Sequence, residues 1–235
     1  MKKLPILALL ILILGCAKEQ PDLIVKANIK GLKKGTVYLK KIKDTTLVTL
    51  DSVIVNGNAE FELVTPLDSP EMYYLFLNKN SNQDEAIAFF ADKGITEINT
   101  TLKNFVFDAK IKGSAQHSKW EEYKAMISRL NERNLDLIVE KFEAQKSGDT
   151  AKLNAIETEN NGLLKRKYLY TVNFALNNKD SEVAPYLALT EIYNARINFL
   201  DTINKALTPK VKNSKYGKEL QIFIDGIKKS NTNKK

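Results

Sequence analysis

The sequence predicts an α+β fold, with an N-terminal antiparallel β-sandwich-like domain over residues 23–115 and an antiparallel α-helical region over residues 116–235. Up to residue 115, short runs alternate apolar and polar residues between turn residues, which is typical of strands that bury one face. Beyond it, apolar residues recur every three or four positions, as along one face of a helix. Hydrophobic residues at 43% and charged residues at 27% indicate a chain that buries a core.

The first fifteen residues have the character of a signal peptide. Lys2 and Lys3 form a short positive segment, and residues 4–14 form an uncharged run. A helix needs about 20 apolar residues to cross a bilayer, so this run is too short for a permanent membrane span. Its length matches the hydrophobic segment of a signal peptide, which is removed from the mature protein.

The run ends Ile13-Leu14-Gly15-Cys16, which resembles the bacterial lipobox of an aliphatic, a variable and a small residue followed by cysteine. The resemblance implies cleavage between Gly15 and Cys16 and attachment of a diacylglycerol to the Cys16 sulfur. Cys16 is the one cysteine of the chain, and it stands where lipid attachment requires it. The alternative is an ordinary secretory signal that happens to end in cysteine.

Residues 16–22 are predicted to form a short polar tether. The basic-then-acidic pair Lys18-Glu19 also resembles the surface-export signal of Bacteroidota-type lipoproteins, although Gln20 interrupts the acidic run; a plain solvated linker is the alternative. The expected location is the cell envelope, with the protein lipid-anchored to the outer membrane on its periplasmic face or at the cell surface. The membrane is thus an expected partner, through the diacylglycerol.

Eight or nine short strands at roughly ten-residue spacing are predicted between residues 23 and 111, as in a β-sandwich or an open barrel. Asn56-Gly57-Asn58 indicates a tight turn, because Asn and Gly tolerate positive φ. We expect Phe61 and Leu63 to face inward on the returning strand.

Two pairs of adjacent aromatic residues, Tyr73-Tyr74 and Phe89-Phe90, fall within predicted strands. Neighbouring side chains of a strand point to opposite faces, so one ring of each pair must leave the sandwich core. We expect these outer rings to meet the helices or a partner. Alternatively, the two pairs line a groove for a peptide or sugar. The other residues that would line this groove are Tyr168, Tyr170, Tyr186 and Tyr193.

A long helix is predicted from about residue 114, with its apolar stripe on Trp120, Tyr123, Ile127, Leu130 and Leu137, widened by Ile138 and Phe142. Ser147-Gly148-Asp149 interrupts it and offers Asp149 as the N-cap of a second, antiparallel helix. Shorter helices are expected over residues 186–193 and 197–207, and Ser214 is expected to cap the last one.

Several short motifs of the β half resemble a known family when taken in order. They are Ile29-Lys30-Gly31, Gly35-Thr36-Val37-Tyr38-Leu39, Leu50-Asp51-Ser52, Asn56-Gly57, Glu60-Phe61, Lys112-Gly113-Ser114 and Trp120. They resemble the N-terminal lipoprotein domain of unknown function that precedes thioredoxin-like domains of the TlpA and AhpC/TSA type in Bacteroidota envelope proteins. The helical stretch resembles the linker between the two. The family's redox activity is not carried over, because no thioredoxin-like segment with C-x-x-C or a peroxidatic cysteine follows in these 235 residues.

No catalytic residue, cofactor site or metal site is predicted. The sole histidine, His117, would need an oriented partner and a nucleophile to act as a base, and the serines beside it are better explained as helix caps. Asp51-Ser52 is expected to bond the local backbone. The adjacent acids Asp84-Glu85 and Glu121-Glu122 point apart. A carboxylate pair brought together by folding stays open at this point.

The positive charge is concentrated in the helical half. Residues 16–115 carry 13 Lys+Arg and 13 Asp+Glu, whereas residues 116–235 carry 21 and 15. The run Lys165-Arg166-Lys167 contributes to this surplus. A secreted protein meets little nucleic acid, so we expect a solvated surface or contact with anionic lipid headgroups, and no nucleic-acid partner.

The leading hypothesis is a non-catalytic, membrane-anchored envelope lipoprotein that acts as a binding or scaffold module, with an envelope protein or glycan as its partner. One alternative is an accessory of a separate thioredoxin-like oxidoreductase. Another is a hydrolase with an unrecognised carboxylate site, which a pocket with convergent acids would favour.

Overall fold

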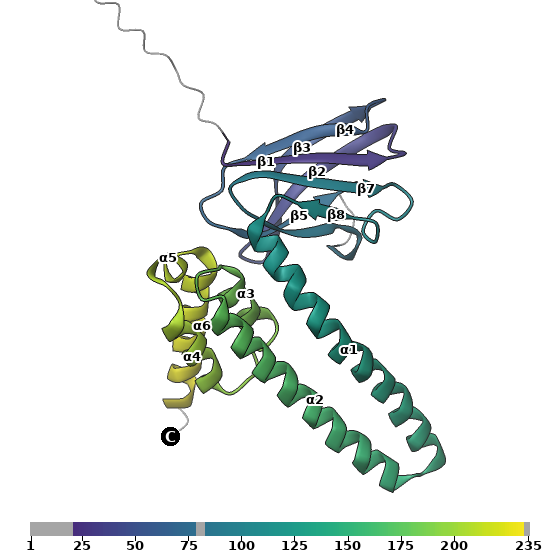
Figure 1. Ribbon diagram of the computed structural model, residues 1–235, viewed down its shortest axis with the longest axis vertical. Coiled ribbons are helices and arrows are strands. Elements are labelled where there is room, and N and C mark those ends of the chain that lie inside the picture. The colour runs from purple at the N-terminus through teal and green to yellow at the C-terminus, as the bar shows by residue number, and fades with distance from the viewer. Residues whose placement is uncertain (1–20, 79–82, 233–235) are drawn as a thin grey trace, which may run out of the picture.

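A computed structural model describes residues 21–78 and 83–232 (Figure 1). The predicted signal peptide, the cleavage site at Gly15 and Cys16, and most of the predicted tether lie outside these residues. The strands precede the helices along the chain, which gives the predicted α+β class. Among the described residues, no helix combines the length and apolar character needed to cross a bilayer.

Two four-stranded sheets form the N-terminal half. The first has the order β4 (Glu60–Thr65), β1 (Leu23–Lys30), β7 (Gly94–Thr101), β8 (Lys110–Lys112). The second has the order β3 (Thr46–Asn56), β2 (Lys34–Lys43), β5 (Glu71–Phe76), β6 (Ile87–Ala91), and the short 3₁₀ helix η1 (Gln83–Glu85) precedes β6. Their inner faces enclose one apolar core, so the architecture is the predicted sandwich.

The strand pairing departs from the prediction at two places. β1 and β7 are parallel, whereas every other pair described is antiparallel. A parallel pair needs a long crossover, and the intervening strands supply it. The turn at Gly57, with φ of 93°, does not close a hairpin: β4 crosses to the first sheet, where Leu63 pairs with Val25. Leu63 is buried and Phe61 packs against the same core, as predicted.

The adjacent aromatic pairs divide between two cores, as the alternation of a strand requires. Tyr73 and Phe89 point into the sandwich, where their rings meet edge to face at 6.2 Å. Tyr74 and Phe90 point outward from the second sheet and pack against the helices. The prediction that the outer rings meet the helices is therefore confirmed.

The helical half consists of α1 (Ala115–Ser147), α2 (Thr150–Asn177), α3 (Val183–Thr190), α4 (Ile197–Ala206), α5 (Pro209–Lys212) and α6 (Lys215–Thr232). The predicted N-caps are confirmed, since Ser114, Asp149 and Ser214 accept backbone N–H groups of their own helices. Gly148 ends α1 with φ of 71°, a left-handed conformation that suits glycine. The bounds of α3 differ, because it begins three residues before the expected 186 and ends three residues before the expected 193, and α5 was not expected.

The first two helices form an antiparallel hairpin that projects away from the sheets, beyond the bundle of α3 to α6 (Figure 1). Arg133 of α1 holds the pair together, because its Nε and Nη2 donate to the Glu159 carboxylate of α2 at 2.7 and 2.9 Å. Tyr123, Ile127 and Leu137 are buried on the predicted stripe.

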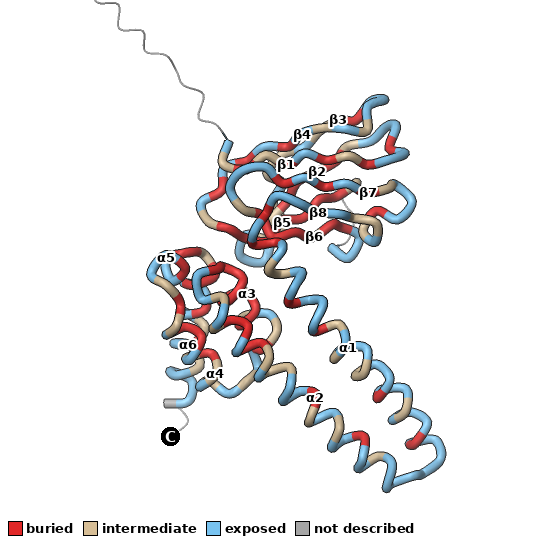
Figure 2. Tube along the Cα trace, viewed as in Figure 1, coloured by how far each residue is buried: buried red, intermediate tan, exposed pale blue. Residues whose placement is uncertain are grey.

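The expectation that Ile138 and Phe142 widen this stripe is wrong. Their exposed fractions are 56% and 71%. The reason is geometric: α2 covers one side of α1, and the distal half of α1 has no second neighbour among the described residues, so its outer edge is exposed in Figure 2.

Candidate functional site

The helical half docks onto the outer face of the second sheet through a cluster of rings. Phe90 of β6 is fully buried and lies 5.4 Å from Tyr186 of α3 and 5.9 Å from Tyr216 of α6, measured between ring centroids. The Tyr186 and Tyr216 rings are 5.1 Å apart. Sheet and helices therefore share one hydrophobic core at this junction.

A buried carboxylate fixes the start of α6 beside this cluster. Glu71 of β5 is 3% exposed and accepts from Lys41 Nζ and from Lys215 Nζ, each at 2.6 Å. The Met72 N–H also donates to the Tyr216 hydroxyl, at 3.0 Å. A carboxylate this deep requires cationic partners, and the two lysines supply them and tie strands β2 and β5 to the helix.

A pocket of about 370 Å³ opens at the same junction. Strands β2 and β5 supply one wall, helices α3 and α6 supply the other, and Gln83 lies at the rim. Three tyrosines and several polar side chains face it, the kind of lining that binds small organic ligands. The lining residues are Ile42, Asp44, Met72, Tyr74, Gln83, Tyr186, Thr190, Lys215, Tyr216 and Glu219.

The polar groups of the pocket are tuned by burial. Desolvation raises the pKa of Glu219, and the nearby charges of Glu71 and Asp44 raise it further, while Lys215 opposes them. Desolvation also raises the pKa of the Tyr186 and Tyr216 hydroxyls. These phenols stay protonated at physiological pH, so they can donate hydrogen bonds to a ligand.

His117 has a structural position. It is 2% exposed, and its Nδ1 accepts the N–H of Phe90 at 3.2 Å, while Ser114 Oγ donates to the Phe90 carbonyl at 2.6 Å. Phe90 belongs to the edge strand β6, so these two side chains satisfy backbone groups that would otherwise lack a partner at the sheet edge. Nε2 then carries the proton and lies 3.3 Å from Glu121 Oε1.

We expect His117 to make the fold acid-sensitive. Burial lowers its pKa below the ordinary 6.5, Lys124 lowers it further, and Glu121 opposes both. Below pH 6.5, His117 is protonated in the unfolded chain but stays neutral in the folded chain. The free energy of unfolding therefore decreases as the pH is lowered, until the pKa of His117 in the folded state is reached. Between pH 7.5 and 5.5, chemical denaturation should show that the wild type loses more stability than His117→Gln, which keeps an acceptor. Equal losses in the two proteins would contradict this assignment.

The other candidate residues of the sequence also have structural positions. Asp51 accepts the N–H of Ser52 and that of Val64, both at 2.8 Å, and so joins edge strands of the two sheets. Glu121 and Glu122 are exposed on α1, and Asp84 and Glu85 are exposed on η1. Folding does not combine any of these pairs into a site.

The basic residues Lys165 and Lys167 of α2 have different environments. Lys167 pairs with Glu191 at 2.8 Å, whereas Lys165 is exposed at a groove between α2 and α4. The candidate tyrosines divide as well: Tyr186 lines the junction pocket, Tyr168 lines the groove, Tyr170 stacks on Tyr123, and Tyr193 is exposed.

Sequence reasoning missed two buried polar clusters. One is Glu71 with its two lysines. The sequence holds a weak signal for it, because Glu71 is an acidic residue at the start of an otherwise apolar strand. The other joins Gln116, Ser181 and Glu182, where Gln116 Nε2 donates to Glu182 Oε2 at 2.8 Å and burial raises the pKa of Glu182. Gln116 lies about 65 residues before Ser181 and Glu182, so no local spacing in the sequence indicates this cluster. Within the part of the chain described, no cluster of His, Cys, Asp or Glu suits a metal ion.

Comparison with known proteins identifies the β half. No curated protein matches the chain. A family model described as "Domain of unknown function (DUF4369)" matches residues 23–120, which include every strand and the first turn of α1 with Ser114 and His117. The resemblance of this half to a domain of unknown function is thereby confirmed.

Proposed function

We propose that the protein is a non-catalytic, lipid-anchored lipoprotein of the cell envelope that binds a glycan in the junction pocket. The observation that carries the proposal is the pocket lining. Three tyrosines supply flat apolar surfaces and protonated hydroxyls, while Gln83, Glu219 and Lys215 supply polar groups around them. Sugar rings have apolar C–H faces and hydroxyl edges, so this combination suits them.

The lipid anchor is supported by the sequence alone. Cys16 ends a lipobox-like motif and precedes a short polar segment that leads into β1. Each buried CH₂ of an acyl chain contributes about 0.8 kcal/mol to membrane binding, so a lipidated cysteine with several chains holds the folded domain at the bilayer. Once Cys16 forms the thioether, these 235 residues keep no free thiol for disulfide exchange.

One observation favours a second function, that of a hydrolase. The pocket brings Asp44 and Glu219 to one cavity, and the raised pKa of Glu219 is the property of a general acid. Two features argue against it. Glu71 is engaged by its two lysines, and the lining side chains that the structure describes include no serine, cysteine or histidine to act as a nucleophile.

The experiment fills the pocket without disturbing the core. Thr190 is exposed at the rim, and its Oγ1 donates to the Tyr186 carbonyl at 3.0 Å. The wild type is first screened against a panel of mono- to trisaccharides of the envelope. For the sugars that it binds, we expect Thr190→Trp to raise the dissociation constant about tenfold or more, which corresponds to ~1.4 kcal/mol. Isothermal titration calorimetry measures this loss.

Thr158→Trp is the matched control, because Thr158 is exposed on α2 and its Oγ1 donates to the Asn154 carbonyl at 2.9 Å. It should bind as the wild type does. Absence of saccharide binding by the wild type, or equal affinity in both variants, would contradict the proposal. Chromatography of the same mixtures identifies cleaved sugars, and cleavage that Glu219→Gln abolishes would establish the hydrolase instead.

A further inference from the structure

The distal half of α1 carries an exposed apolar stripe on the side away from α2. Leu135, Ile138, Val139 and Phe142 have exposed fractions of 62%, 56%, 60% and 71%. Their spacing of three, four and seven residues places them on one line of the helix. The buried Leu137 faces α2 from nearly the opposite side of the helix. We refer to the four exposed residues as the α1 stripe.

One flank of the α1 stripe is acidic. Glu132, Asp136 and Glu143 follow each other at spacings of four and seven residues along this flank, and all three are exposed. No ion pair joins them to another residue of the described chain. A surface that covers the stripe would therefore gain from positive charge along this edge.

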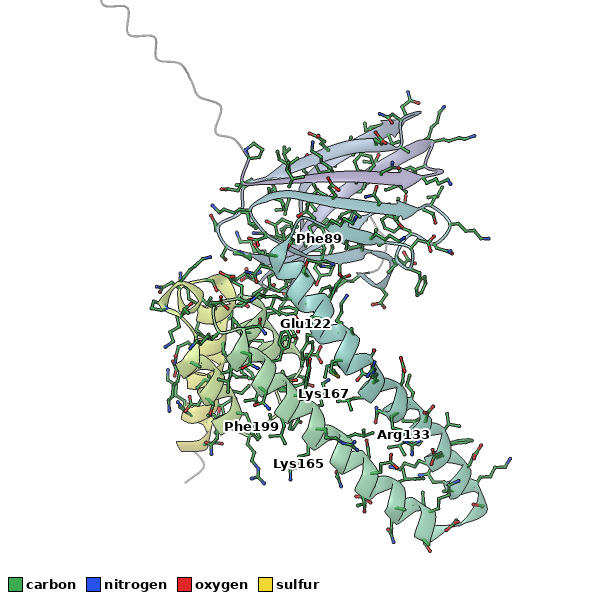
Figure 3. The ribbon with its side chains drawn as sticks, viewed as in Figure 1. Phe89, Glu122, Arg133, Lys165, Lys167 and Phe199 are labelled. Carbon is green, nitrogen blue, oxygen red and sulfur yellow. The ribbon has the colours of Figure 1, made fainter. Side chains whose placement is uncertain are left out.

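A second surface with complementary character lies on the far side of the hairpin. Helices α2 and α4 enclose a groove of about 410 Å³. Leu164, Tyr168, Leu169 and Phe199 supply its apolar lining, and Lys165 and Arg196 supply positive charge. Figure 3 shows Lys165 and Phe199 on the side of α2 that faces away from α1. We refer to this surface as the α2–α4 groove.

We infer that the α1 stripe of one molecule docks into the α2–α4 groove of a second copy. Both surfaces are apolar at their centres, and their charges are opposite. Their lengths also agree, since the stripe spans about 10 Å and the groove spans about 12 Å along α2, at 1.5 Å per residue. Lys165 and Arg196 make no ion pair within the described chain, so both cations are available to the acidic flank.

The alternative antiparallel pairing of two α1 stripes is disfavoured by charge. In an antiparallel pair of identical helices, each flank faces the same flank of the other copy. Glu132, Asp136 and Glu143 would then meet their own counterparts, and like charges at close range destabilise the contact. The stripe and groove lie on opposite sides of the hairpin, so their contact is head to tail and propagates from one copy to the next.

The test measures molecular mass by density-matched sedimentation equilibrium of the lipidated chain in detergent. We expect the mass of the wild type to rise with concentration. Val139→Glu/Phe142→Glu removes the stripe and Lys165→Glu/Arg196→Glu removes the charges of the groove, so each double variant alone should stay monomeric. An equimolar mixture of the two keeps one intact stripe and one intact groove, and should reach twice the monomer mass and no more.

Ile222→Glu is the control, because Ile222 is 70% exposed on α6 and lies outside both surfaces. It should associate as the wild type does. All substituted side chains are at or near the surface, so melting temperatures should not change. A wild type that stays monomeric at every concentration would overturn the inference. A mixture that stays monomeric while the wild type associates would overturn it too, because the contact would then not join stripe to groove.

Discussion

Replacing Phe90 with alanine is expected to lower the free energy of unfolding by about 3–5 kcal/mol, the range found when a large buried aromatic is truncated. Phe90 is fully buried and packs against Tyr186 and Tyr216. Its backbone also holds the first turn of α1 through Ser114 and His117. The cavity would open where the sheet meets the helices, so the loss should weaken the docking of the two halves.

Chemical denaturation followed by circular dichroism measures this loss. Phe107→Ala is the matched control, since the same side chain is removed from a position that is 93% exposed. Its effect should stay within about 0.5 kcal/mol, as for other surface substitutions. If Phe90→Ala were as mild as the control, the ring cluster at the junction would not hold the halves together.

The sequence predicts those parts of the fold that depend on local pattern. Period-two alternation marks the strands, and the split of Tyr73-Tyr74 between two cores follows from it directly. Cap chemistry marks the helix ends, because Ser114 and Asp149 satisfy N–H groups only a few residues away. These signals are short-range, so they can be recognised without knowing how the elements pack.

Long-range pairing leaves no such mark. The turn at Gly57 has the residues of a hairpin, yet β4 pairs with β1, because the sheet that a strand joins depends on the whole sandwich. The prediction that Ile138 and Phe142 are buried fails for a related reason. Helix α1 is apolar on two sides, and its sequence alone does not show which side α2 covers.

The candidate site is the extreme case of this limit. Its walls come from residues as far apart as Ile42 and Glu219, and no motif spans them. The signal that survives in the sequence is indirect. Phe89-Phe90 predicts that an aromatic ring leaves the sandwich, and the pocket opens where Tyr186 and Tyr216 cover that ring.

The position of the predicted anchor implies an orientation of the molecule relative to the membrane. The described chain enters β1 at the end of the molecule opposite to the tip of the α1–α2 hairpin (Figure 1). A lipid on Cys16 would therefore leave both the α1 stripe and the α2–α4 groove away from the point of attachment. Neighbouring molecules on one membrane could then meet through their hairpins.

The anchor itself is tested by Cys16→Ser, which we expect to abolish incorporation of labelled fatty acid and to leave a precursor that still carries residues 1–15. A thiol can be converted to the thioether that holds the diacylglycerol, whereas a serine hydroxyl is a far weaker nucleophile near neutral pH. Metabolic labelling followed by electrophoresis reports both effects. Ala17→Ser is the control, because it leaves Cys16 in place and should be labelled and processed normally. Labelling of the Cys16→Ser protein would show that the lipid is attached elsewhere and would refute the assignment of Cys16 as the lipobox cysteine.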